Sequence, residues 1–235
     1  MNFIDLFIIL LLAFGVIKAI HKGFLNTFFG CIAVILAILL SLITYPILSS
    51  ILNSQKNVSN ALMLYVEGSN RLDSVESQHL DIETTEDSEL MSVIDEASFP
   101  APYSNIIKNN IHYRVFSKNE IYTLGEYVDK TLACALLNTV CFLLLFFIYY
   151  LAMRFIINIM DHRKGFYVLK KHEALFAGAA GALLYSLLLS VFFLLVSVGL
   201  VTANVSQLTQ YVSSSLLGSL YYKVNAFVFL ISGTI

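Results

Sequence analysis

Four long apolar runs dominate the pattern of hydrophobic and polar positions along this chain of 235 residues. The hydrocarbon core of a bilayer is about 30 Å thick, and a helix needs roughly 20 mostly apolar residues to cross it. Every run is close to that length or longer, so the pattern predicts an all-α fold with four transmembrane helices. The predicted spans are residues 3–20, 24–48, 132–157 and 174–201.

A short polar break, AIHKGFLN at residues 19–26, separates the first two runs. Lys18 and Lys22 lie at this break without an acidic neighbour, which indicates a tight hairpin. Asp5 and Lys18 stand near the two ends of the first run, where both reach the headgroup region, so neither needs to be buried. The positive charges follow the apolar core of this run, whereas a signal peptide places them before it, so we interpret residues 3–20 as a span.

Two transmembrane hairpins, residues 1–48 and 132–201, are therefore separated by a long connection, residues 49–131. This connection is too long to be a plain linker, so part of it should be folded. Segments 57–67 and 87–97 place apolar residues about one helical turn apart, which predicts a helix in each. The candidate N-caps of these helices are Asn57, Ser59 and Asp87.

The rest of the connection has weaker signals. Residues 81–89, DIETTEDSE, are interpreted as a solvated loop because they lack the spacing and the glycine of an EF-hand. Pro100 and Pro102 disfavour a helix, so SFPAPYSN is predicted to be extended. Residues 125–134 are expected to run directly into the third span as one longer helix.

The tail, residues 202–235, has apolar residues at roughly helical spacing with polar residues between them. This pattern predicts an amphipathic helix that lies on the outer membrane surface. The residues 226–231, AFVFLI, are too few to span a bilayer. The apolar positions of the tail helix are Leu208, Tyr211, Val212, Leu216, Leu220 and Val224.

Composition supports the membrane interpretation and charge gives it an orientation. The chain is 58% hydrophobic and only 13% charged, whereas soluble domains are about 25% charged. Twelve of the 16 acidic residues lie between Glu67 and Glu126, and both short connections are basic. By the positive-inside rule, the short connections are cytoplasmic, and both termini and the acidic loop lie outside. The bases that set this topology are Lys18, Lys22, Arg154, Arg163, Lys164, Lys170 and Lys171.

The residue types that carry chemistry are sparse. Cys31, Cys134 and Cys141 all lie inside apolar runs and have no close-spaced cysteine or histidine, so they are interpreted as small apolar residues rather than metal ligands. No metal, nucleotide or nucleophile motif occurs, and no basic cluster is typical of nucleic-acid binding. We therefore expect no cofactor, no catalytic residue and no nucleic-acid partner. The expected partner is the lipid bilayer, and further copies of this chain or other membrane proteins are candidate partners.

Small residues recur at the start of the fourth span. Ala177 with Gly181, and Gly178 with Ala182, are pairs four residues apart, so each pair shares one helix face. Such faces allow two helices to approach closely in lipid. The sequence leaves two readings open, which are packing among the four spans of one chain and formation of an oligomer.

The N-terminal sequence MNFIDLFIILLLAFGVIKAIHKGFLNTFFG resembles the start of the bacterial colicin V production protein (CvpA) family. Members of that family open with a short apolar helix that carries an early Ile-Asp, followed by a basic Arg-Gly-Phe turn and a second span. Ile-Asp at positions 4–5 and Lys-Gly-Phe at positions 22–24 occupy those places here. The likeness continues through a variable outer segment, a third span ending in Arg154 and a fourth span that begins with small residues.

The fourth span departs from the family pattern of glycines four apart, because Ala177 stands at the first position and Tyr185 replaces a further small residue. The resemblance implies a bacterial cytoplasmic-membrane protein associated with production or export of a peptide toxin, and no catalytic residue carries over. The first hypothesis is thus a non-enzymatic protein that acts by assembly in the membrane. The second is a small pore-forming or transporter subunit, and the third is an intramembrane enzyme using Asp161, His162 or His172.

Overall fold

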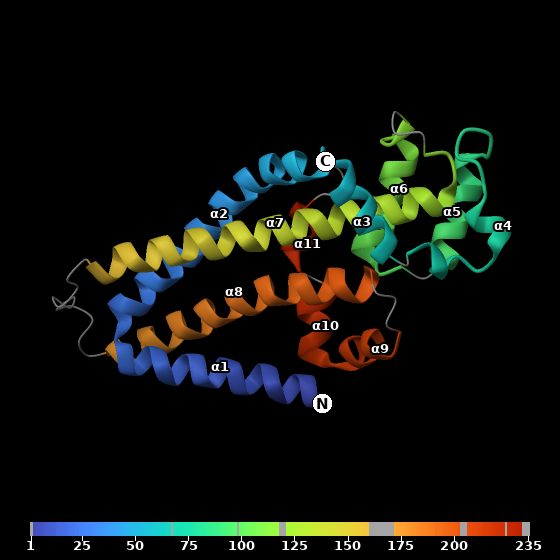
Figure 1. The fold of residues 1–235 in the computed structure, drawn as a ribbon. Coiled ribbons are helices and arrows are strands. Elements are labelled where there is room, and N and C mark those ends of the chain that lie inside the picture. Colours follow the sequence, from blue (N-terminus) through green and yellow to red (C-terminus); the bar gives the residue numbers. More distant parts are fainter. Residues whose placement is uncertain are drawn as a thin grey trace.

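Four long helices form the body of the molecule in the computed structural model of the chain (Figure 1). They are α1 (Phe3–Lys22), α2 (Phe24–Asn53), α7 (Leu124–Ile159) and α8 (Glu173–Thr202). All four are long and apolar enough to cross a membrane, which confirms the predicted all-α fold with four candidate spans. The structure describes residues 2–66, 68–97, 99–117, 121–159, 172–202, 206–223 and 225–231.

Local signals fix both ends of α1. The side chain of Asn2 accepts hydrogen bonds from the backbone amides of Ile4 and Asp5, while the Asn2 amide donates to Asp5 Oδ2 over 2.9 Å. This reciprocal arrangement is a capping box, and it satisfies amides that a helix start otherwise leaves unpaired. At the other end Gly23 has φ +83°, a conformation that glycine adopts without strain, so this single residue separates α1 from α2.

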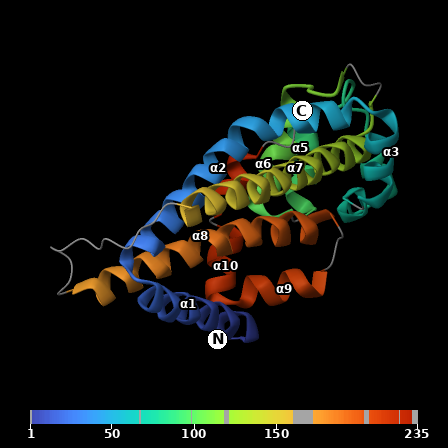
Figure 2. The ribbon, with the colours of Figure 1, turned by 60° about the vertical axis from the view of Figure 1, so that its left-hand side comes forward.

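The long helices diverge from this turn. In both ribbon views α1 and α2 separate as they leave Gly23, and α8 lies beside α1 (Figures 1 and 2). Helix α8 packs against α1, α2 and α7, whereas α7 packs mainly along α2. The predicted continuation of the third span toward its N-terminus is confirmed, because α7 begins at Leu124. Helix α2 also continues through Pro46 to Asn53, beyond the predicted end at residue 48.

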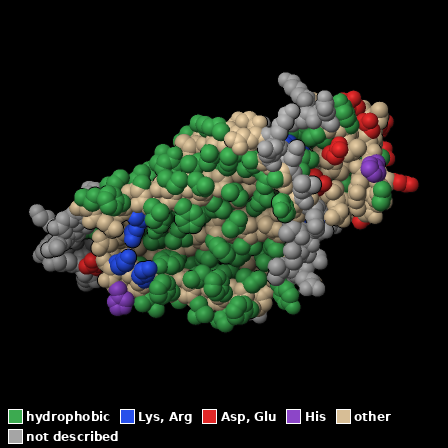
Figure 3. Space-filling view, in the orientation of Figure 1, with side chains coloured by type: hydrophobic (Ala, Val, Ile, Leu, Met, Phe, Trp, Pro, Cys, Tyr) green, Lys and Arg blue, Asp and Glu red, His purple; other side chains and the backbone are tan. Residues whose placement is uncertain are grey.

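The outer surface of the bundle is apolar. On the face in Figure 3, hydrophobic side chains form a band between a group of basic side chains at one end and most of the acidic side chains at the other. A large apolar surface of this kind is typical of a protein that contacts lipid. The exposed apolar residues include Phe3, Leu10, Ile43, Ile47, Phe147, Leu151, Phe155 and Phe192.

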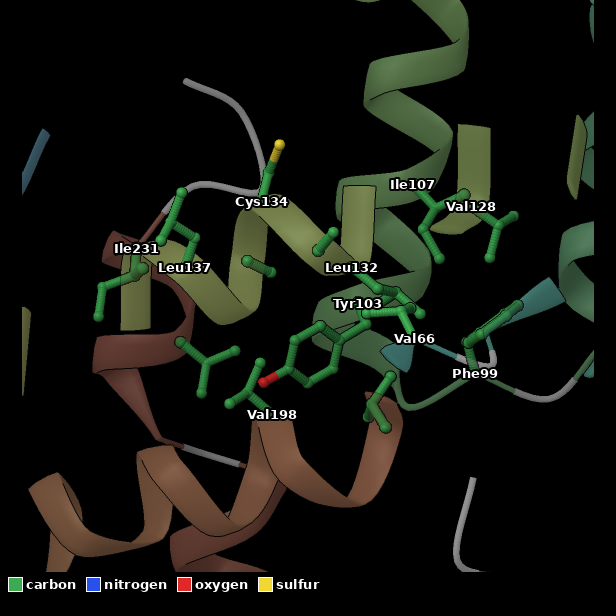
Figure 4. Packing of buried hydrophobic residues seen from close by; sticks show 14 of the residues in the cluster. Val66, Phe99, Tyr103, Ile107, Val128, Leu132, Cys134, Leu137, Val198 and Ile231 are labelled. Atoms are coloured by element: carbon green, nitrogen blue, oxygen red, sulfur yellow. The ribbon is translucent and has the colours of Figure 1, made fainter. Parts of the chain in front are cut away.

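A small helical domain lies at the acidic end, around the first turns of α7. Both predicted helices of the long connection are confirmed within it, as α3 and α5. Its core is continuous with that of the bundle: Tyr103 is 2% exposed and lies near Leu132 of α7 and Val198 of α8 (Figure 4). The elements are α3 (Lys56–Tyr65), η1 (Ser69–Arg71), α4 (Val75–Gln78), α5 (Asp87–Glu96) and α6 (Ala101–His112).

Two predictions within this domain are wrong. Pro100 is the N-cap of α6 and Pro102 lies in its first turn, where a missing amide proton costs no hydrogen bond, so the segment predicted to be extended begins a helix. The predicted N-caps are also displaced. Helix α5 is preceded by Glu86, with Asp87 as its first residue, and α3 is preceded by Gln55.

The tail differs from the single surface helix that its spacing predicted. It forms three short helices, α9 (Ser206–Ser214), α10 (Leu216–Lys223) and α11 (Ala226–Leu230). Asn225 Nδ2 donates to the carbonyl oxygen of Ser190 over 2.8 Å. Ser190 lies 12 residues before the end of α8, which corresponds to about 18 Å along the helix. The tail therefore folds back along α8 and enters the bundle about 18 Å from the end of that helix.

Candidate functional site

Asp5 is the polar residue that holds the re-entrant tail. Its side chain is 1% exposed, and Oδ1 accepts hydrogen bonds from Ser215 Oγ over 2.7 Å and from the Leu217 amide over 2.8 Å. The expectation that Asp5 need not be buried is therefore wrong, because the tail covers its carboxylate in the first turn of α1. Ser215 and Leu217 lie more than 200 positions away in the sequence, so no local pattern could identify them as partners of Asp5.

Further hydrogen bonds, to α8 and within the tail itself, satisfy polar groups of the tail. Ser186 Oγ and Tyr221 Oη lie 2.8 Å apart, and Asn225 Oδ1 accepts from the Phe227 amide at the start of α11. On the other side of the tail, the rings of Phe227 and Phe142 of α7 stack at 6.4 Å. Irregular backbone at membrane depth is tolerated when protein groups satisfy it, and these contacts do so.

The small residues of α8 face α1. A Cβ atom at Gly181 would collide with Ala19 Cβ and would lie 2.8 Å from the carbonyl oxygen of Gly15. Gly178 is buried beside Val16, Ala177 is fully buried, and Ala182 is partly buried. The closest helix approach that these residues permit therefore occurs within one chain.

A large residue on α8 packs against a glycine of α1 one turn further along α8. Tyr185 takes a place where small residues were expected, and Gly15 of α1 makes room for it, because a Cβ at Gly15 would lie 2.5 Å from the Tyr185 ring. The same ring meets Phe14 edge-on at 6.2 Å. A bulky residue on one helix and glycine on the other thus preserve the close packing of α1 and α8.

Three of the topology-setting bases come together at the opposite end of the bundle from the acidic domain. Lys18 and Lys22 of α1 and Arg154 of α7 line a single cavity of about 70 Å³, which we call the basic pocket. Figure 3 shows a group of basic side chains at this end. The remaining lining residues are Gly15, Ala19, Asn26, Thr27, Tyr150, Leu184, Tyr185 and Leu188.

Four other predicted bases, Arg163, Lys164, Lys170 and Lys171, lie outside the described residues, as do Asp161 and His162. In the described part of the chain, the ion pairs of Lys108 with Asp95 and of Arg114 with Asp87 lie in the small domain, where His112 Nδ1 also lies 3.3 Å from Asp87 Oδ2. The three cations of the basic pocket therefore have no carboxylate partner among the described residues.

An apolar groove adjoins the basic pocket between α1 and α8. It has a volume of about 240 Å³ and shares Tyr185 and Leu188 with the pocket. Apolar side chains line almost all of it, and we call it the α1–α8 groove. Its other lining residues are Phe7, Leu11, Leu189 and Phe192.

Polar contacts attach the acidic domain to the bundle, and those of Asp129 and Arg71 are among them. Asp129 of α7 accepts hydrogen bonds from the amide and the hydroxyl of Ser69 over 2.8 and 2.7 Å. Arg71 Nη2 donates to the Leu200 carbonyl oxygen over 3.1 Å, near the end of α8, where unpaired carbonyls favour a cation. Burial lowers the pKa of Arg71, and it raises the pKa of Tyr222 nearby.

The three cysteines are buried and form no disulfide, and the described residues contain no cluster of potential metal ligands. Among the residues that the structure describes, four helices are long and apolar enough to cross a membrane, with a basic pocket at one end of the bundle and an acidic helical domain at the other. Its architecture is that of a multi-pass membrane protein. No family model, curated protein or solved structure matches the chain.

Proposed function

We propose that this chain is a non-enzymatic, multi-pass protein of the bacterial cytoplasmic membrane that supports the production or export of a peptide toxin by assembling with partner proteins. The toxin role rests on the resemblance to the CvpA family. The observation that supports it is the placement of the positions that carry the resemblance. Asp5 holds the re-entrant tail, Gly23 forms the turn between α1 and α2, and Arg154 lines the basic pocket.

The acidic domain is the surface best suited to a partner. The small-residue face of α8 is covered by α1, so it is not free for another helix. The acidic domain instead presents carboxylates to solvent on a folded core that α7 joins to the bundle. A surface of one charge attracts a partner of the opposite charge. The exposed carboxylates are Asp73, Glu76, Glu83, Glu86, Glu89, Asp95 and Glu96.

The proposed orientation places the basic pocket at the cytoplasmic side and the acidic domain outside, by the positive-inside rule. A protease added to intact spheroplasts should then cleave the acidic domain. Protection of that domain until the membrane is permeabilised would reverse the orientation and remove the outer partner from the proposal.

Charge reversal tests the partner surface. The triple variant Glu76→Lys, Glu86→Lys and Glu89→Lys should lose partners that cross-link to the wild-type protein in native membranes and should lower secreted toxin, with an unchanged protein level. Glu173→Lys is the control, because this carboxylate is exposed near the basic end. Unchanged cross-linking in the triple variant would contradict the acidic surface as the partner site. Unchanged toxin secretion after deletion of the gene would contradict the toxin role.

A pore-forming or transporter subunit is the second candidate, and the re-entrant tail favours it. Segments that enter a membrane without crossing it are found at ion and substrate paths, where protein or water surrounds them. Purified protein in liposomes should then release an entrapped ion, and Asp5→Ala should change the rate because it frees the tail. Liposomes that retain their contents would favour the assembly role.

A further inference from the structure

The basic pocket concentrates positive charge that the described residues leave uncompensated. Lys18, Lys22 and Arg154 all line one cavity, and none pairs with a described carboxylate. The carboxylate of Glu173 lies near the Gly23 turn, but Glu173 does not line the cavity. Cations gathered at a partly enclosed site repel one another, and an anion bound between them removes that cost.

The size of the basic pocket suits a small anionic group. Its volume of about 70 Å³ is several times the roughly 10–15 Å³ of cavity space that a single water molecule needs. Arg154 offers a planar set of donors that matches phosphate oxygens, and the two lysines offer point charges. A phosphate group therefore fits both the charge and the volume of the pocket.

One stripe of α1 links the basic pocket to the α1–α8 groove. Phe7, Leu11, Gly15, Lys18 and Lys22 follow one another at intervals of three or four residues, so they share one face of the helix. The polar end of this stripe lines the pocket and the apolar end lines the groove. A ligand lying along it would meet cations at one end and hydrocarbon at the other.

We propose that the basic pocket and the α1–α8 groove together bind one anionic phospholipid, with its phosphate among Lys18, Lys22 and Arg154 and an acyl chain in the groove. The spacing supports this assignment. Lys18 lies 11 residues from Phe7, which corresponds to about 16 Å along α1. Half of a bilayer core is about 15 Å, so the stripe has the length of the hydrocarbon layer of one leaflet.

The site would bind lipid in either orientation of the protein, so it does not depend on the proposed function. It needs only that the basic end of the bundle lies at a membrane surface. Lys18 is exposed four residues before the end of α1, about 6 Å along the helix, and its ammonium lies 5.4 Å from the centre of the Phe14 ring. A lysine stem on an apolar ring with its charge at the surface is the usual arrangement at an interface.

The experiment is a lipid titration of the purified full-length protein in detergent, followed by native mass spectrometry. Phosphatidylglycerol should bind one-to-one and at least about 25-fold more tightly than phosphatidylcholine with the same acyl chains. Lys18→Gln with Lys22→Gln should reduce that preference about 25-fold, since each cation contributes about fivefold near a lipid surface. Both lysines are exposed, so these substitutions should leave the fold intact.

Lys108→Gln is the matched control, because it removes a lysine from the acidic domain and should leave phosphatidylglycerol binding unchanged. Glycerol 3-phosphate separates a lipid site from a free-anion site, since it has the anionic group without acyl chains. Displacement of phosphatidylglycerol by equal concentrations of glycerol 3-phosphate would overturn the role of the groove. Equal binding of the two phospholipids, or a preference retained by the double lysine variant, would overturn the proposal.

Discussion

Two glycines of α8 provide a test of the packing between α1 and α8. Gly181 is in contact with α1, where a Cβ would collide with Ala19 and lie 2.8 Å from the Gly15 carbonyl oxygen. A Cβ atom at Gly199 would meet nothing within 4 Å outside its own stretch of helix. The same Gly→Ala substitution can therefore be made at a closed site and at an open site of one helix.

The expected effects have opposite signs. At Gly181 the added methyl group meets backbone, so α1 has to move, and overpacking of this kind costs about 1–3 kcal/mol. At Gly199 the methyl group enters open space, and the gain in helix propensity is at most about 1 kcal/mol. The free energies of unfolding of the two variants should therefore differ by about 1–4 kcal/mol.

Unfolding by sodium dodecyl sulfate in mixed micelles, followed by near-ultraviolet circular dichroism of the tyrosines, measures this difference. Gly181→Ala should unfold at a lower detergent fraction than the wild type, and Gly199→Ala at the same or a higher one. Gly178→Ala should fall between them, because its Cβ would lie 3.4 Å from Val16, an ordinary contact distance. Equal shifts at positions 181 and 199 would refute the close approach of α1 and α8.

Two further predictions concern polar and titratable groups. Asp5→Ala should increase hydrogen exchange of amides in α9 and α10 about tenfold or more, because Ser215 and Leu217 lose their shared acceptor. Hydrogen exchange in α5 should not change and serves as the control. An unchanged exchange rate in α10 would contradict the anchoring role of Asp5. Burial raises the pKa of Tyr103, so the stability contributed by its neutral form should be complete below about pH 10 and lost as the pH rises through the raised pKa. In the Tyr103→Phe variant, the free energy of unfolding should therefore fall less steeply above about pH 10 than in the wild type. Identical pH dependence in the two proteins would contradict the burial of the Tyr103 hydroxyl.

The long helices could be predicted from the sequence because their signal is local. A run of about 20 apolar residues is visible in any window of that length, and the helical spacing in α3 and α5 needs only two or three turns. The error at Pro100 and Pro102 was also local: both residues disfavour a helix interior, but both suit a helix start. The sequence does not say which of these two positions a proline will occupy.

The sites could not be predicted, because they join residues that are distant in sequence. The sequence marks Lys22 and Arg154 only as residues of two separate turns, and they reach one cavity because α1 and α7 run in the same direction through the bundle. Asp5 resembles any carboxylate near a membrane surface until the tail folds back onto it. The spacing of Asn2 and Asp5 did contain the capping box, the one feature of this region that the sequence alone could have revealed.

Helix α7 has 36 residues and is about 54 Å long, so it exceeds the bilayer core by about 24 Å. It is one uninterrupted rod that carries Asp129 near the acidic domain and Arg154 near the other end. A tilt of the rod by 10° about its midpoint would displace each end by about 5 Å. Because the helix is continuous, any change in its tilt moves the residues at the acidic domain and the charged side chain near the other end together.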